Sequence, residues 1–160
     1  MTVSVNGQKQ PVETDITVRL AQLINAQGAE LAGSYQRVLR EALFNRRATI
    51  RPNMVKQIAA DEVDAFASFL HTSNGAISRG EQLHQVGLND QPLLRMGQVT
   101  RQFLVMQLDN GEIAPALKIF DAYQEQLFQG FIQSLEKGVF TVQERTRHAY
   151  ERVADRNGRK

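Results

Sequence analysis

Three histidines are the side chains of this sequence best suited to bind a metal or to move protons near neutral pH. They are His71, His84 and His148. Zinc and iron sites built from side chains use ligands at short, regular spacings, and these histidines lie 13 and 64 residues apart. We therefore expect no metal site. The chain has no cysteine and no recognisable set of nucleophile, base and acid, so we also expect no enzymatic activity.

Three carboxylates lie close together within the predicted helix over residues 52–72. They are Asp61, Glu62 and Asp64, and no second carboxylate pair opposes them. General acid–base chemistry with carboxylates needs two such groups facing each other in different environments. We therefore predict that this cluster is a solvated face of the helix rather than a catalytic site.

A small basic corner is formed by Arg46, Arg47 and Arg51 between two predicted helices. Such a corner could hold an anion. Cations near the end of a helix more often compensate its dipole, and this is the role that we predict for the three arginines.

The composition limits the classes of protein to consider. The chain has 160 residues, of which 42% are hydrophobic and 22% charged, as expected for one folded domain with a real core. Its formal net charge of +2 is too small to indicate a nucleic-acid partner. No apolar run reaches the roughly 20 residues of a membrane span, and no secretory signal is present. Together with the lack of cysteine, these features favour a soluble, cytoplasmic protein without membrane contact.

Apolar residues recur at three- and four-residue spacing along most of the chain and predict an all-α fold. About six helices are expected, over residues 16–27, 29–44, 52–72, 76–86 and 92–108 and from about residue 112 onward. Gly28 interrupts the first pair, Asn74-Gly75 ends the third helix, and Pro92 lies at the start of the fifth. Residues 1–14 are expected to form a flexible arm, or a small hairpin around Asn6-Gly7.

The last predicted helix carries a heptad pattern. Its apolar or small positions are spaced 4, 3, 4, 3, 4, 3 and 4 residues apart, as in a coiled coil. We call these eight positions the seam: Phe128, Ile132, Leu135, Val139, Val142, Thr146, Ala149 and Val153. The β-branched residues at every second position of the seam favour two parallel strands. The alternative is that this is only the last helix of a bundle, with a frayed end.

The width of the apolar face changes along this helix. Up to Phe140 additional apolar residues flank the seam, which suits packing against a globular body. Beyond Val142 only the seam remains, and a helix with so narrow a stripe is marginally stable alone. We therefore divide the chain into a helical body over 15–140 and a coiled-coil extension over 141–160. We expect a homodimer whose extension leads to an output domain or a signalling partner, the chain itself stopping before any such domain.

Two stretches resemble bacterial sensor proteins. The segment RGEQLHQVGLNDQPLLRMGQVTRQF, from Arg79 to Phe103, resembles the region around the haem-binding helix of globin-coupled sensors. RRATIRPNMVKQIAADEVDAFASFL, over residues 46–70, and QERTRHAYERVADR, over 143–156, resemble haem-less relatives. These relatives are the globin-like amino-terminal domains of RsbR-type stressosome proteins. The resemblance covers about residues 15–155 and is diffuse.

The resemblance implies a globin-like bundle that dimerises and relays a signal through its terminal helix. Aligned on Gly87-Leu88, the family's haem-ligating histidine corresponds to Leu83, which cannot bind iron. His84 follows one position later, about 100° around the helix. A haem-less domain is therefore expected, with a haem-binding gas sensor using His84 and a structural adaptor as alternatives.

An apolar ligand could occupy the place of haem in such a domain. The residues that could line this pocket are Phe66, Phe69, Leu70, Leu83, Val86, Leu94, Val99 and Phe103. The same residues suit a filled hydrophobic core, and this is the interpretation that we favour. No cofactor is therefore expected.

Overall fold

The structure is a computed structural model that describes the backbone of residues 11–158 and the side chains of residues 15–158. It contains five α-helices: α1 (Pro11–Phe44), α2 (Val55–Thr72), α3 (Ala76–Gln85), α4 (Asp90–Gln107) and α5 (Asn110–Asn157). A single 3₁₀ turn, η1 (Pro52–Met54), precedes α2. No strand occurs among the described residues, and one isolated antiparallel bridge pairs Ala48 with Leu88. The all-α class is therefore confirmed.

The difference between six expected helices and five observed ones lies in α1. The two segments predicted on either side of Gly28 form one helix of 34 residues with a kink at Gln27, where φ is −129° and ψ is 15°. A Cβ atom on Gly28 would lie 3.2 Å from Cγ1 of Val63, so the glycine lets α2 pack closely against the bend. The helix also begins at Pro11, so residues 11–14 are helical where an arm was expected; residues 1–10 lie outside the described residues.

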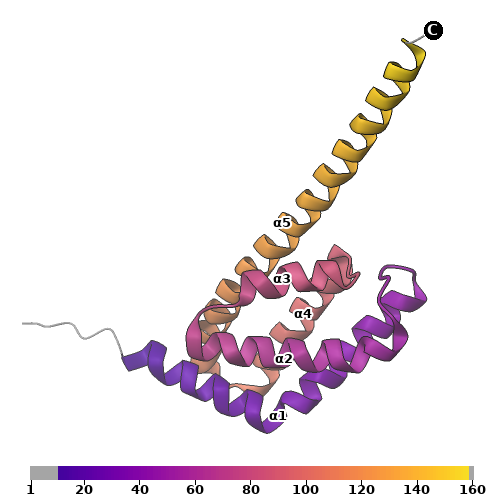
Figure 1. Ribbon diagram of the computed structural model, residues 1–160. Helices are drawn as coiled ribbons and strands as arrows, with labels where there is room; N and C mark the ends of the chain where they lie inside the picture. The colour runs from indigo at the N-terminus through magenta and orange to yellow at the C-terminus, as the bar shows by residue number, and fades with distance from the viewer. Residues whose placement is uncertain (1–10, 159–160) are drawn as a thin grey trace, which may run out of the picture.

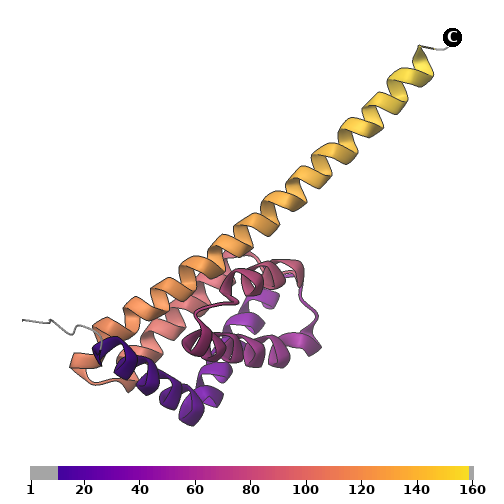
Figure 2. The ribbon, with the colours of Figure 1, turned by 60° about the vertical axis from the view of Figure 1, so that its left-hand side comes forward.

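The helices form a body from which the second half of α5 projects as a rod (Figure 1). The bent α1 packs against α2 and α4, and α3 packs against α5. Turning the molecule shows that the first half of α5 lies along the body and that its C-terminal half leaves it without a bend (Figure 2).

One hydrophobic core joins all five helices. Its fully buried side chains come from α1, α2, α3, α4 and the turn between α3 and α4: Leu20, Leu31, Leu39, Phe66, Leu83, Leu88, Leu93 and Leu104. Phe120, Tyr123 and Leu127 add the face of α5 that lies on the body. Phe66 meets the Phe120 ring edge to face, with ring centroids 5.5 Å apart. The apolar stripes predicted from the helical period therefore meet in a single core.

Two glycines allow α3 and α5 to cross in backbone contact. A Cβ atom on Gly80 would lie 1.9 Å from the carbonyl oxygen of Leu127, and one on Gly130 would lie 1.8 Å from that of Ile77. Real Cβ atoms do not approach backbone atoms so closely. Small residues on both helices are therefore a condition for this crossing.

The loop between α1 and η1 is fixed to the turn between α3 and α4. The backbone N–H of Thr49 donates a hydrogen bond to the carbonyl oxygen of Gly87, at 2.9 Å. Gly87 has a φ of 105°, and a Cβ atom there would meet the Thr49 hydroxyl at 2.4 Å. The backbone N–H of Arg47 caps α1 by donating to the carbonyl of Ala42, at 2.7 Å.

Candidate functional site

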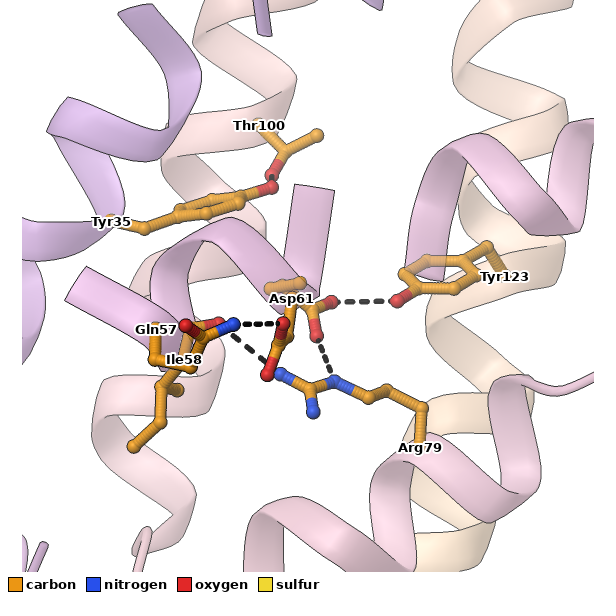
Figure 3. A network of polar contacts seen from close by, with 8 residues as sticks. Tyr35, Gln57, Ile58, Asp61, Arg79, Thr100 and Tyr123 are labelled. Carbon is orange, nitrogen blue, oxygen red and sulfur yellow. Dashed lines mark hydrogen bonds and ion pairs between the residues drawn. The ribbon is translucent and has the colours of Figure 1, made fainter. Parts of the chain in front are cut away.

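A buried polar cluster lies between α2, α3 and α5 (Figure 3). Nε of Arg79 donates to Oε2 of Glu62 at 2.9 Å, and the Tyr123 hydroxyl donates to Oε1 of Glu62 at 2.6 Å. Arg79 also donates to the carbonyl oxygen of Ile58, at 3.2 Å. The side chains of Arg79 and Glu62 are only 11% and 5% exposed. One carboxylate in the cluster therefore connects three helices.

A second pair extends this cluster to α1 and α4. The hydroxyl groups of Tyr35 and Thr100 share a hydrogen bond of 2.5 Å, and Thr100 donates to the carbonyl of Met96 at 2.8 Å. Both side chains are buried. Tyr35, Glu62, Thr100 and Tyr123 line the same cavity, which has a volume of about 10 Å³. That space holds one water molecule at most, and we call the five residues Tyr35, Glu62, Arg79, Thr100 and Tyr123 the buried cluster.

Burial dominates the electrostatics of this cluster. Removal from water raises the pKa of Glu62 above its ordinary value, while the Arg79 guanidinium and the Tyr123 hydrogen bond act in the opposite direction. Burial also raises the pKa of Tyr35 and that of Tyr123 well above the usual range of tyrosine, and the nearby Glu62 adds to both effects. The tyrosines therefore remain neutral and serve as hydrogen-bonding groups.

The burial of Glu62 contradicts the prediction of a solvated acidic face. Asp64 is exposed as predicted, but Asp61 is half-buried and accepts a hydrogen bond from Gln57, and Glu62 is 4% exposed. Glu62 lies four residues after Ile58 and four before Phe66, which are both buried, so the helical spacing alone could have placed it on the side of α2 that faces the core. Its partners were not, because Arg79 and Tyr123 follow 17 and 61 residues later.

The residues named as a possible pocket lining are mostly buried in the core, although Phe103 and Val99 also line a surface groove of about 490 Å³ between α1 and α4. Phe66, Leu70, Leu83 and Phe103 are all at most 7% exposed and belong to one hydrophobic cluster with Phe69. None of these residues lines the small cavity beside the buried cluster. Val86 and Leu94 were placed in the same set, but they are 36% and 47% exposed. Val99 is partly buried.

His84 contacts α5 on the side of α3 that Leu83 does not occupy. Its Nδ1 shares a hydrogen bond of 2.7 Å with the Ser134 hydroxyl, and its ring meets the Phe131 ring edge to face at 5.3 Å. Leu83 is fully buried. The two side chains therefore point in different directions, and in this arrangement His84 serves as a contact between helices. A haem-binding role of His84 stays a prediction.

The other candidates from the sequence lie at the surface. His71 is exposed in the last turn of α2, and His148 is exposed on α5 between Glu144 and Glu151. The side chains of Arg46, Arg47 and Arg51 are exposed. Within the described part of the chain, no group of three or more histidine or acidic side chains could hold a metal ion.

The seam leaves the body as a bare apolar stripe. Phe128 is partly buried, whereas Ile132, Leu135, Val139, Val142 and Val153 are between 46% and 62% exposed. From Leu135 to Gly158 every residue is exposed except Glu144, which is half-buried. On the opposite side of the rod Arg147 forms ion pairs with Glu144 and Glu151, and the His148 ring lies 3.6 Å and 3.4 Å from the same two carboxylates. The rod is thus amphipathic, with charges on one side and the seam on another.

Comparison of the chain with models of protein families, with curated proteins and with solved structures gave no match. The resemblance to RsbR-type sensor domains therefore stays a hypothesis. No helix in the described part of the chain has both the length and the apolar character needed to cross a membrane.

Proposed function

We propose that the chain is a non-catalytic regulatory input domain that pairs with a second copy through the seam and passes a change in its body along α5. The observation that carries this proposal is the continuity of α5. One helix of 48 residues begins in the body and ends in the bare apolar stripe. A rigid helix of this kind transmits rotation or displacement of its first half to whatever lies beyond its second half.

The body supports a signalling role through the buried cluster. Tyr123 ties α5 to Glu62 of α2, and Arg79 ties α3 to the same carboxylate. A change in the position or charge of Glu62 therefore acts directly on α5. We place the domain in the cytoplasm, because a chain without cysteine suits a reducing compartment.

The exposure of the seam supports pairing. An isolated helix with so thin an apolar stripe is marginal in water, and a second copy in parallel orientation would cover the stripe along its length. The charged side of the rod would remain in water. An output domain joined to the end of α5 would then receive two adjacent helices.

A single substitution in the seam tests this pairing. Val142→Glu places two carboxylates in one layer of the paired helices, and we expect dimer dissociation to become at least about a hundredfold more favourable, which corresponds to about 3 kcal/mol. Val142 is 62% exposed in one protomer, so the body should fold as before. Sedimentation equilibrium at micromolar concentration measures the change.

The matched control is Thr141→Glu, which adds the same charge to the neighbouring position outside the seam. Thr141 is exposed and only its hydroxyl bonds to the carbonyl of Lys137 within the helix. We expect this variant to dimerise like the parent chain. A monomeric parent chain, or equal dissociation of both variants, would contradict pairing through the seam.

The two alternative functions, a haem-binding gas sensor and a structural adaptor, stay predictions. A haem sensor requires that haemin binding depend on His84, whose Nδ1 already bonds to Ser134. A structural adaptor requires apolar contact surface on the body. Leu94, Val105 and Met106 of α4 are between 47% and 81% exposed and would supply it.

A further inference from the structure

A hollow with an apolar floor lies between the C-terminal part of α1 and the first turn of α4. Its volume is about 270 Å³. Val38, Ala42 and Pro92 form its floor, and all three are buried. Pockets for drug-sized ligands usually measure about 300–1,000 Å³, so this hollow suits a side chain of a partner better than a separate small molecule.

The rim of the hollow is mainly cationic. Arg47 and Arg95 stand on it, with Glu41 as the one carboxylate among the lining residues. The Arg95 guanidinium donates to Oε2 of Glu41 at 3.3 Å, and both side chains are 55% exposed. Within the described residues, the side chain of Arg47 forms no hydrogen bond or ion pair. Exposed pairs such as Arg95–Glu41 contribute little and exchange readily with competing carboxylates.

The segment of the chain that supplies most of the lining of this hollow is strongly basic. Residues 37–56 contain six cationic side chains against one carboxylate, a net of +5 in a chain whose total is +2. All six cations are exposed: Arg37, Arg40, Arg46, Arg47, Arg51 and Lys56. An approaching anionic segment is therefore attracted to this end of the body.

The first turn of α4 adds to this potential. Gln91 and Pro92 line the hollow at the positive end of the helix dipole, and Asn89 makes no side-chain cap. Asp90 is the only acidic residue of that turn. Arginine guanidinium groups bind carboxylates in bidentate geometry, which suits the same kind of ligand.

We propose that this hollow binds an acidic linear segment of a partner protein, with one apolar side chain on the floor and flanking carboxylates on Arg47 and Arg95. Nucleic acid fits less well, because no aromatic side chain lines the hollow for a base to stack on. An anionic membrane is the competing ligand, because Phe44 beside these cations is 88% exposed, and vesicle binding is one of the outcomes of the test. The inference does not depend on pairing through α5.

A labelled peptide tests the proposal on the full chain. The probe is a fluorescein-labelled peptide of alternating glutamate and leucine, and its control peptide has glutamine in place of glutamate. We expect fluorescence anisotropy to show binding of the acidic peptide only. Asn45 also lines the hollow. Arg95→Gln and Asn45→Glu should each weaken binding about tenfold by speeding dissociation. Methyl signals of Val38 should shift in NMR spectra on binding.

Arg40→Gln is the matched control, because Arg40 belongs to the same charged segment but does not line the hollow. It should change affinity less than about twofold, acting mainly on the association rate. Binding should persist in Val142→Glu, whatever its oligomeric state. Absence of peptide binding, equal loss in Arg40→Gln, or tighter binding of duplex DNA or of phosphatidylserine vesicles than of the peptide would each overturn the proposal.

Discussion

Glu62 and Arg79 form a pair whose stability depends on burial as much as on charge. Moving a carboxylate and a guanidinium out of water is costly, and their attraction offsets this cost only when hydrogen bonds satisfy the remaining atoms. The Tyr123 hydroxyl supplies one such bond to Glu62, and the Ile58 carbonyl receives one from Arg79. The pKa of Glu62 is nevertheless raised, so burial outweighs its partners. The folded state thus holds this proton more tightly than the unfolded chain.

Replacing the cation of this pair should make folding sensitive to pH. In Arg79→Met the buried carboxylate loses the group that lowers its pKa, and we expect the free energy of unfolding to fall by about 3–5 kcal/mol near neutral pH. Most of this loss should disappear in acid, because Glu62 then binds a proton in the folded state. The stability that protonated Glu62 contributes is fully present below pH 4.5, the ordinary pKa of the carboxyl group. It is lost as the pH rises through the higher pKa that Glu62 has in the folded state.

Urea unfolding at several pH values measures both effects. Arg95→Met is the matched control, since it breaks the exposed pair with Glu41. This variant should lose less than about 1 kcal/mol at every pH. A pH-independent loss in Arg79→Met would show that the variant suffers only from lost packing.

At the scale of helices, the crossing of α3 over α5 depends on two glycines, whose lack of a side chain lets the backbones touch. Gly80 and Gly130 face the backbone of the opposite helix, and rigid backbone atoms cannot move aside as side chains do. His84 and Ser134 bond across the same pair of helices. This contact therefore sets the position of α5 on the body, and with it the direction of the rod.

Adding one methyl group at this crossing should destabilise the fold. We expect Gly80→Ala and Gly130→Ala each to lower the free energy of unfolding by about 1–3 kcal/mol, because the new Cβ forces the helices apart. Chemical denaturation followed by circular dichroism gives the value.

Gly33→Ala is the control for these variants. Gly33 lies within α1, and a Cβ atom there would have no neighbour within 4 Å. Alanine should stabilise the helix there by about 0.4–1 kcal/mol, because the unfolded chain loses freedom. If Gly80→Ala behaved like Gly33→Ala, the close contact would not exist in solution.

At the scale of the whole molecule, the body and the rod have different sources of stability. The body has its own core, whereas nearly all residues of the rod are exposed. In a single chain, the part of the rod beyond Phe140 gains mainly helix formation and the ion pairs along its charged side. Its persistence as a helix in solution should therefore depend on a partner.

Removing the rod should separate these two contributions. We expect a chain that ends at Phe140 to keep a folded body, with a free energy of unfolding within about 1 kcal/mol of the monomeric Val142→Glu variant. Its midpoint of thermal unfolding should not depend on protein concentration, whereas that of the full chain should rise with concentration. A midpoint of the full chain that is independent of concentration would contradict dimerisation.

The sequence by itself determined the features that depend on neighbours along the chain. The all-α class follows from apolar residues at three- and four-residue spacing, which is a property of one helix at a time. The ends of α2 and α3 and the bend near Gly28 follow from local turn and cap signals. The exposed stripe beyond Val142 was also visible, because mainly charged and polar residues flank the seam there.

Only the tertiary structure decided the features that depend on distant parts of the chain. It joined two predicted helices into one helix that is kinked at Gln27. It buried Glu62 by bringing Arg79 and Tyr123 to it. It placed Phe66 and Leu83 in a filled core rather than around a pocket. Periodicity shows which face of a helix is apolar. The space between two such faces depends on how closely the two helix backbones approach each other. Where α3 crosses α5, Gly80 and Gly130 set this distance.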